Sequence, residues 1–190
     1  FFSNQNFIST DFKNQSKLHI FYNDETIDRK RIFIREKNKI SKIKIILDKE
    51  NKTFSSLFQN CLIIKELKFK RFNRKNITDM SGLFYNCASL NILDITKMKT
   101  ENVTNMRFMF GFCSSLKELN LLHFNTNKVT NISGMFRKCN LLESLDLSNF
   151  NTYNVTNMSC LFQLCSSLKK LNISNFNTKN VTNMQNMFYN

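Results

Sequence analysis

A period of 26 residues runs through most of this chain of 190 residues. It is marked by cysteines that recur at one repeated position: Cys61, Cys87, Cys113, Cys139 and Cys165. A fixed period of about 20 to 50 residues is typical of a solenoid, in which one small unit stacks on copies of itself. The cysteines are therefore interpreted as one repeated core position.

Each unit begins with a threonine that precedes a short apolar run at helical spacing. The run Met158, Leu161, Phe162 and Cys165 is one copy, and it predicts about two turns of helix. Because a threonine hydroxyl can accept a hydrogen bond from the backbone at a helix start, these threonines are predicted N-caps. They are Thr78, Thr104, Thr130, Thr156 and Thr182.

A Leu-x-x-Leu-x-Leu segment follows each run, for example Leu142, Leu145 and Leu147. Its last positions alternate between apolar and polar residues, which predicts a strand with one buried face. One strand and one helix per period predict an α/β solenoid with a parallel β-sheet on one face and short helices on the other. Since crossovers between parallel strands are almost always right-handed, the stack is expected to be right-handed.

The chain is predicted to have three parts. Residues 1–16 are polar and unpatterned, which predicts a flexible lead-in. Residues 17–39 alternate like strands and are predicted to form an N-terminal β cap over the apolar end of the stack. Residues 40–190 are predicted to form the solenoid, with an irregular first strand at Ile43 and Ile45.

The period would place the next repeated cysteine directly after Asn190. The solenoid is therefore expected to be truncated at its C-terminus, and an open last coil would favour self-association through its apolar surface. No apolar run approaches the ~20 residues that cross a bilayer, so no transmembrane segment is predicted.

The residues from Asn149 to Leu171 read Asn-Phe-Asn-Thr-x-Asn-Val-Thr-Asn-Met-x-x-Leu-Phe-x-x-Cys-Ser-Ser-Leu-x-x-Leu. This phrase resembles the repeat of the BspA-like leucine-rich-repeat surface proteins, and the resemblance covers roughly residues 40–190. It implies a leucine-rich-repeat solenoid at the cell surface or secreted, and a non-enzymatic role in adhesion or protein recognition. Phe108 and Cys160 depart from the pattern, because other copies have Ser or Gly there.

The outward strand positions form two rows that vary while the inward rows do not. Such rows would present one open face to a protein or glycan ligand, although solvation alone is an equal alternative. The candidate binding residues are Glu66, Lys68, Asp94, Glu118, Asn120, Asp146, Lys170 and Asn172.

Basic residues cluster near the start of the solenoid, in a chain whose net charge is +14. The cluster comprises Lys65, Lys68, Lys70, Arg71, Arg74 and Lys75. Binding of a polyanion or nucleic acid through this segment is the alternative function. The outward rows lack aromatic stacking platforms, which makes nucleic acid the weaker of the ligand classes.

The cysteines favour a structural role. Stacked coils lie about 4.8 Å apart, close enough for neighbouring cysteines to form disulfides. Equivalent side chains point in parallel, however, so buried free thiols are favoured. Cys160 is outside the register and is the best candidate for a reactive thiol.

No catalytic or metal-binding group recurs with the period. His19 and His123 have no recurring Asp or Ser partner, there is no Cys-x-x-Cys motif, and the glycines are isolated. No metal, cofactor or enzymatic activity is predicted. Asn102, Asn154 and Asn180 begin Asn-x-Thr sequons, which either accept glycans or hydrogen-bond along the stack.

Overall fold

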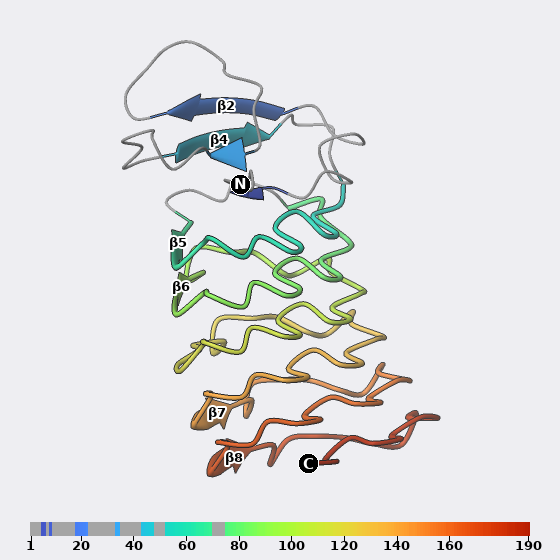
Figure 1. Ribbon diagram of the computed structural model, residues 1–190. Coiled ribbons are helices and arrows are strands. Elements are labelled where there is room, and N and C mark those ends of the chain that lie inside the picture. The colour runs from blue at the N-terminus through green and yellow to red at the C-terminus, as the bar shows by residue number, and fades with distance from the viewer. Residues whose placement is uncertain are drawn as a thin grey trace.

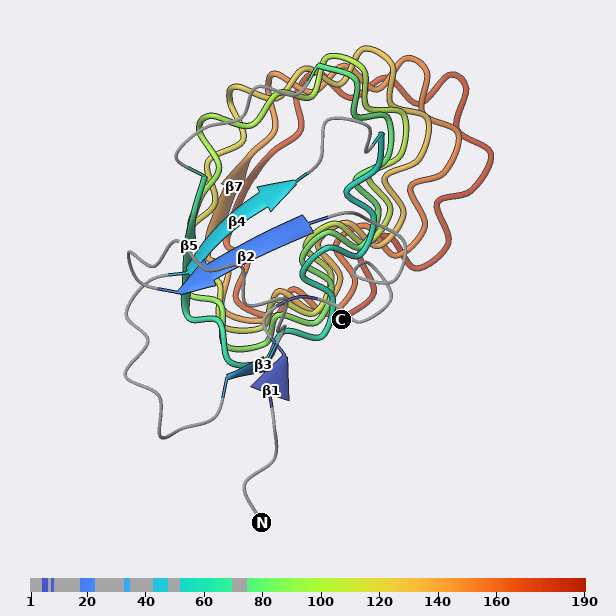
Figure 2. The same ribbon diagram turned by 90° about the horizontal axis from the view of Figure 1, so that it is seen from above.

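The computed structural model describes residues 5–6, 8, 18–22, 33–34, 43–47, 52–69 and 75–190. From residue 52 onward the chain winds into a stack of coils that superpose when seen along the stack (Figures 1 and 2). Isolated parallel bridges join each coil to the next at a single position that repeats every 26 residues. This position is occupied by Thr53, Asp79, Asn105, Asn131, Asn157 and Asn183.

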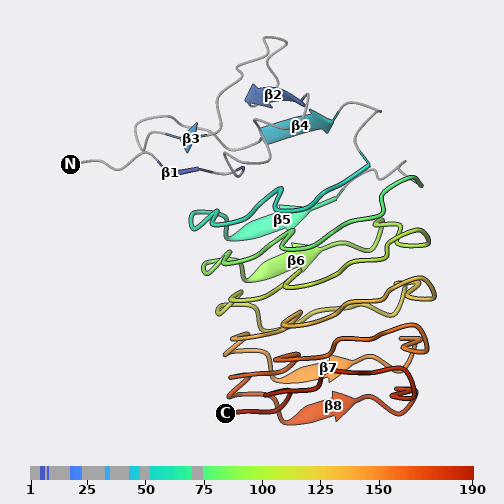
Figure 3. The same ribbon diagram turned by 90° about the vertical axis from the view of Figure 1, so that its right-hand side faces the viewer.

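Short parallel strands lie along one side of the stack (Figure 3). Strand β5 (Glu66–Lys68) pairs with β6 (Ile92–Asp94), and β7 (Ser144–Asp146) pairs with β8 (Lys170–Asn172). The register places Leu67 beside Leu93 and Leu145 beside Leu171. Because neighbouring residues of a strand point to opposite faces, these leucines lie inward and their neighbours outward.

The short helices that the sequence predicts are absent from the described residues, which contain strands and turns but no helix. Each apolar run instead forms successive tight turns, and we call these runs the turn segments. They comprise residues 53–61, 79–87, 105–113, 131–139, 157–165 and 183–190.

Hydrogen bonds explain why turns replace helices. In the first turn segment, the N–H groups of Leu57, Gln59 and Cys61 donate to carbonyls three residues earlier, at 3.1–3.2 Å. The N–H groups that alternate with these, for example those of Phe58 and Asn60, donate to carbonyls of the next coil at 2.8–2.9 Å. A helix would bond all its N–H groups internally, whereas this backbone divides them between its own turn and its neighbour.

The predicted N-cap role of the threonines is also wrong. The hydroxyls of Thr104, Thr130, Thr156 and Thr182 donate to the carbonyl of the equivalent threonine one coil earlier, for example from Thr130 to Thr104 at 3.2 Å. The next residue makes the turn instead: Asn131 Oδ1 accepts from the Ser133 N–H at 2.9 Å. Asn and Asp readily form such turns with the backbone two residues on, which explains their recurrence at this position.

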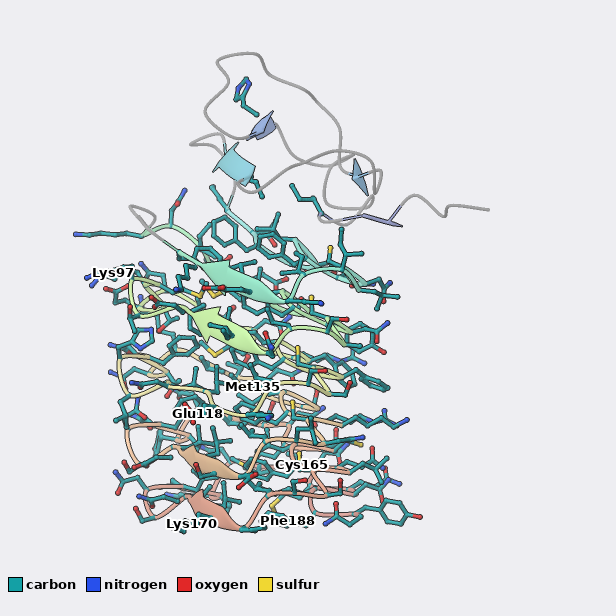
Figure 4. All side chains as sticks on the ribbon, turned by 60° about the vertical axis from the view of Figure 1, so that its left-hand side comes forward. Lys97, Glu118, Met135, Cys165, Lys170 and Phe188 are labelled. Carbon is teal, nitrogen blue, oxygen red and sulfur yellow. The ribbon has the colours of Figure 1, made fainter. Side chains whose placement is uncertain are left out.

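The core is a set of identical side chains stacked along the coils (Figure 4). Phenylalanine rings in the turn segments stack with centroids 5.5–5.8 Å apart. They are Phe58, Phe84, Phe110, Phe136, Phe162 and Phe188. The four rings from Phe84 to Phe162 are therefore buried between two neighbouring rings, whereas Phe188 stacks on one ring and is 57% exposed.

Buried threonines in the loops after the strands add a second link between coils. Thr126 is 2% exposed; its Oγ1 donates to the Asn151 carbonyl at 3.0 Å and accepts from the Asn151 N–H at 2.8 Å. Thr100 and Thr152 make the same reciprocal pair with the next coil. A buried hydroxyl must be hydrogen-bonded to avoid a desolvation penalty, and here the partner is always the neighbouring coil.

The N-terminal strands lie over one end of the stack (Figure 1). Strand β2 (Leu18–Tyr22) pairs antiparallel with β4 (Ile43–Leu47), and β1 (Gln5–Asn6) pairs antiparallel with β3 (Phe33–Ile34). The residues predicted as the first solenoid strand, Ile43 and Ile45, therefore pair with β2 rather than with β5.

Residues 1–16 were expected to form a flexible lead-in, but two parts of this segment are ordered by contacts. Strand β1 pairs with β3, and Ile8 is fully buried within the hydrophobic cluster of the coils. An isoleucine gains by burial even inside a polar segment, and the pattern over residues 1–16 did not reveal this contact. The domain boundary between residues 39 and 40 lies outside the described residues and stays a prediction, as do the right-handed crossover and the leucine-rich-repeat classification.

Candidate functional site

The predicted binding residues lie on the outward face of the strands and of the equivalent segment 118–120. The first row contains the first residue of each strand position, namely Glu66, Ile92, Glu118, Ser144 and Lys170. The second row contains the third residue, namely Lys68, Asp94, Asn120, Asp146 and Asn172. Figure 4 places Glu118 and Lys170 on the side of the stack that carries the strands.

The second row is largely committed to turns. Asp94 Oδ1 accepts from the N–H and Oγ1 of Thr96 at 3.1 and 2.7 Å, and Asp146 Oδ1 accepts from the Ser148 N–H at 2.9 Å. These bonds hold the pKa of each carboxyl below its usual value. The largest contribution comes from the Thr96 hydroxyl at Asp94 and from the Ser148 backbone N–H at Asp146. Asn120 and Asn172 accept from the backbone in the same way. The recurrence of Asp and Asn in this row therefore has a structural cause.

Lys68 is the exception in the second row. Its Nζ lies 2.8 Å from Glu66 Oε1, and this hydrogen bond is the main cause that raises the pKa of Lys68. Both side chains are about half exposed. An exposed pair contributes only about 0–1 kcal/mol to stability, so its main effect is to neutralise this end of the face.

The rest of the first row is free. Within the part of the chain that the structure describes, the side chains of Glu118, Ser144 and Lys170 make no hydrogen bond or ion pair. Ile92, in the same row, is 49% exposed. Side chains that stabilise nothing within the stack are available to a ligand, and the first row is where they gather.

The predicted basic cluster is only partly described. Lys65, Lys68 and Lys75 are exposed. Lys70, Arg71 and Arg74 lie outside the described residues, so the structure does not place this cluster as a whole.

The repeated cysteines are free and buried, which confirms their interpretation as core thiols. The Sγ–H of Cys87 donates to the Phe58 carbonyl at 3.0 Å, and the three later cysteines of the register make equivalent bonds. Burial raises the pKa of Cys87 to about 12 and that of Cys165 to about 11. These thiols are therefore protonated at neutral pH. Cys160 is also a free thiol, but it is only half-buried.

The remaining polar residues singled out in the sequence have structural surroundings. The ring of His123 packs edge-on against Phe124 at 5.0 Å, and partial burial lowers its pKa. The amide groups of the sequon residues Asn102, Asn154 and Asn180 donate to backbone carbonyls one coil earlier at 2.6–2.7 Å. These three asparagines therefore bond along the stack, as one of the two readings expected.

Sequence reasoning missed a cluster on the turn segments. The centroid of the Tyr85 ring lies 5.7 Å from that of Phe108 and 5.1 Å from that of Phe112, and Arg107 lies over the Phe108 ring. The departure of Phe108 from the repeat was the available signal. Within the described ranges no group of three or more potential metal ligands occurs, and no helix is long and apolar enough to cross a membrane.

The fold and its exposed rows define a repeat protein in which each coil bonds only to its neighbours. More particularly, the chain belongs to the family described as "Mycoplasma protein of unknown function, DUF285", whose model matches residues 52–145 and again residues 119–190. Neither the curated proteins nor the solved structures include a significant match to the chain.

Proposed function

We propose that the chain is a non-enzymatic recognition scaffold, part of a BspA-like leucine-rich-repeat solenoid that binds a protein ligand at or outside the cell surface. Two lines support this assignment. The family to which the chain belongs is found in BspA-like surface repeat proteins. The phrase that resembles their repeat covers the same stack of coils that carries the two rows.

The contrast between the two rows carries the proposal. Apart from Lys68, the second row makes the turns after the strand positions, so its residue types are constrained by the fold. The first row varies in charge and polarity, and its residues Glu66, Ile92, Ser144 and Lys170 sit on strands that each pair with one neighbouring coil. A rigid scaffold that presents a variable row is how repeat proteins build extended binding surfaces.

The charges of the first row suggest the character of the ligand. The acidic Glu118 lies nearer the N-terminal end of the row than the basic Lys170, with Ser144 between them. A complementary protein surface would place a cation against Glu118 and an anion against Lys170.

The test is a binding screen with the full chain immobilised, run against cell-surface and extracellular-matrix proteins and glycans at two salt concentrations. For any protein ligand found, Lys170→Glu is expected to weaken binding about tenfold. Lys179→Glu makes the same charge change at an exposed residue outside the rows and should leave affinity within about twofold. Equal affinity of Lys170→Glu, Glu118→Lys and the unmodified chain would refute the assignment.

The polyanion alternative predicts a different result in the same screen. Its support is the exposure of Lys65 and Lys75, whereas the ion pair between Lys68 and Glu66 weakens it. Binding to nucleic acid or heparin whose affinity falls steeply with salt, and which Lys65→Gln reduces, would favour this alternative.

We also expect self-association through the last coil. Phe188 and Tyr189 are 57% and 60% exposed, and the Phe188 ring stacks on Phe162 with its other face uncovered by any described residue. Light scattering should detect oligomers that Phe188→Ser reduces. A monomer at high concentration would contradict this expectation.

A further inference from the structure

Glycine is rare in this chain, and all three glycines lie in the turn segments, two of them against the Phe108 side chain. A Cβ placed on Gly134 would lie 2.0 Å from Cε1 of Phe108, and one placed on Gly111 would lie 3.1 Å from its Cδ1. These two glycines therefore make room for the Phe108 ring.

Gly82 has a different environment. It occupies the same repeated position as Phe108 and Gly134, with a φ of +58°, yet a Cβ there would meet no atom closer than 3.5 Å. Positive φ does not by itself require glycine at this position, because Ser56 and Asn186 adopt it with φ values of 59° and 57°. A side chain would therefore fit at Gly82 without a clash, and its absence leaves a space beside Ser56, Gln59 and Tyr85.

That space is an open pocket of about 280 Å³, which we call the Gly82 pocket. It spans three successive coils, with Gly82 in the middle one. Its lining residues are Ser56, Gln59, Ser81, Gly82, Tyr85, Arg107 and Phe108. The rings of Tyr85 and Phe108, whose centroids are 5.7 Å apart, supply an aromatic wall. The serines and Gln59 supply groups that both donate and accept hydrogen bonds.

The charge of the Gly82 pocket is positive. The Arg107 guanidinium lies 5.1 Å from the centre of the Phe108 ring, and it makes no ion pair with any described residue. No acidic residue lines the pocket. Asp79, the acidic residue of the turn segment that contains Gly82, accepts a hydrogen bond from the Ser81 N–H through its Oδ1 at 2.8 Å. An anionic group in the pocket would therefore meet an uncompensated guanidinium.

We propose that the Gly82 pocket binds one residue of an acidic sugar, a hexuronic acid, with its carboxylate on Arg107 and its ring against Tyr85 and Phe108. Guanidinium groups suit carboxylates because their N–H groups can bond both oxygens. The volume is just below the usual range for small-molecule pockets, and it is large enough for one sugar ring.

The neutral groups distinguish a sugar from an acidic side chain. A carboxylate side chain can only accept hydrogen bonds, so it offers no donor of its own to the Gln59 carbonyl oxygen. Sugar hydroxyls donate as well as accept and can pair with Gln59 and Ser56 together. The site uses the turn segments and not the outward rows of the strands, so it is independent of the proposed protein recognition.

The test is calorimetric titration of the full chain with a galacturonic acid trisaccharide and with a neutral galactose trisaccharide. The uronate is expected to bind at least tenfold more tightly than the neutral sugar. Arg107→Gln should reduce uronate affinity to the level of the neutral sugar, while the matched charge change Lys138→Gln should leave it within about twofold. Lys138 lies over the Phe112 ring and does not line the pocket.

Gly82→Asn provides a second, steric test. Asparagine already occupies this repeated position at Asn186 with a positive φ, so the variant should fold while its side chain fills the pocket. Loss of uronate binding in a variant that still unfolds in one cooperative transition is the expected result. Unaltered binding in Gly82→Asn, no binding of the uronate by the unmodified chain, or tighter binding of an acidic peptide would each overturn the proposal. Lys170→Glu should not affect uronate binding, so failure here and failure of the protein-recognition proposal are distinguishable.

Discussion

Replacing Gly134 with alanine should destabilise the protein far more than the same change at Gly82. Both glycines occupy the same position of the repeat and have nearly the same φ, +61° and +58°. They differ in what an added methyl group would meet. At Gly134 it would lie 2.0 Å from the Phe108 ring, whereas at Gly82 the nearest atoms are 3.5 Å away.

The expected magnitudes follow from these distances. A left-handed conformation costs a residue with a Cβ about 1–2 kcal/mol, and both variants incur this cost. The gain from a less flexible unfolded chain is also common to both and cancels in the comparison. Only Gly134→Ala must also displace a packed ring, and overpacking costs about 1–3 kcal/mol. The free energy of unfolding should therefore fall by about 2–5 kcal/mol for Gly134→Ala and by about 1–2 kcal/mol for Gly82→Ala.

The assay is equilibrium unfolding in urea, followed by far-ultraviolet circular dichroism and by tyrosine fluorescence. Coincident transitions from both probes would justify a two-state free energy. A double-mutant cycle with Phe108→Ser isolates the ring, because serine occupies the same position at Ser56. In that background Gly134→Ala should cost only the backbone part, so the coupling energy should exceed about 1 kcal/mol.

A coupling energy near zero would refute the reasoning. It would mean that the Phe108 ring moves aside without loss, and that the contacts of this ring with Tyr85 and Gly134 do not stabilise the fold. Equal destabilisation by Gly82→Ala and Gly134→Ala would lead to the same conclusion.

Three further predictions concern the links within and between coils. At pH 8 a thiol reagent should modify one cysteine of the folded chain, Cys160, and all six after denaturation; rapid reaction of a second thiol would contradict the burial of the others. Thr126→Val removes both hydrogen bonds of its hydroxyl to Asn151 and should lower the free energy of unfolding by about 1–3 kcal/mol; an unchanged urea midpoint would argue against this link. Because folding lowers the pKa of Asp94 and Asp146 from 3.8, their stabilisation is present above that pH and is lost as the pH falls through their lower folded values. Asp94→Asn/Asp146→Asn should therefore unfold at a urea midpoint that varies less with pH below 4 than that of the unmodified chain.

The period predicted which residues face inward with few exceptions. Cys113, Phe110 and Leu116 are all fully buried, as their repeated positions required. The outward rows were equally predictable, because alternation along a strand is a local property. The sequence could not separate the two rows, since the role of Asp94 depends on a turn whose hydrogen bonds only the folded loop defines.

The helix prediction failed for a physical reason. Apolar residues at Met80, Leu83, Phe84 and Cys87 have helical spacing, but successive turns also bring these four positions to the inside. A helix and a series of tight turns differ in the carbonyls to which alternate N–H groups donate. The pattern of apolar residues is the same for both, so it does not distinguish them. Asn86 has a positive φ of 57°, and the only sign of this conformation in the sequence was the residue type, asparagine.

The Gly82 pocket shows a further limit. Phe108 was recognisable as a departure at a position where other copies have Ser or Gly, but its meaning depends on which neighbour the Phe108 ring covers. The ring turns toward Gly134 and leaves Gly82 open, a choice that depends on packing among three coils.

The sequence by itself determined the length of the coil, the identity of the inward positions and the residues that occupy the outward strand rows. These follow from periodicity, because burial of apolar side chains is repeated identically in each unit. Only the tertiary structure decided how the backbone is satisfied. Each turn segment shares its N–H groups with the next coil, since the stacked neighbour offers carbonyls at hydrogen-bonding distance where a helix would have to supply its own.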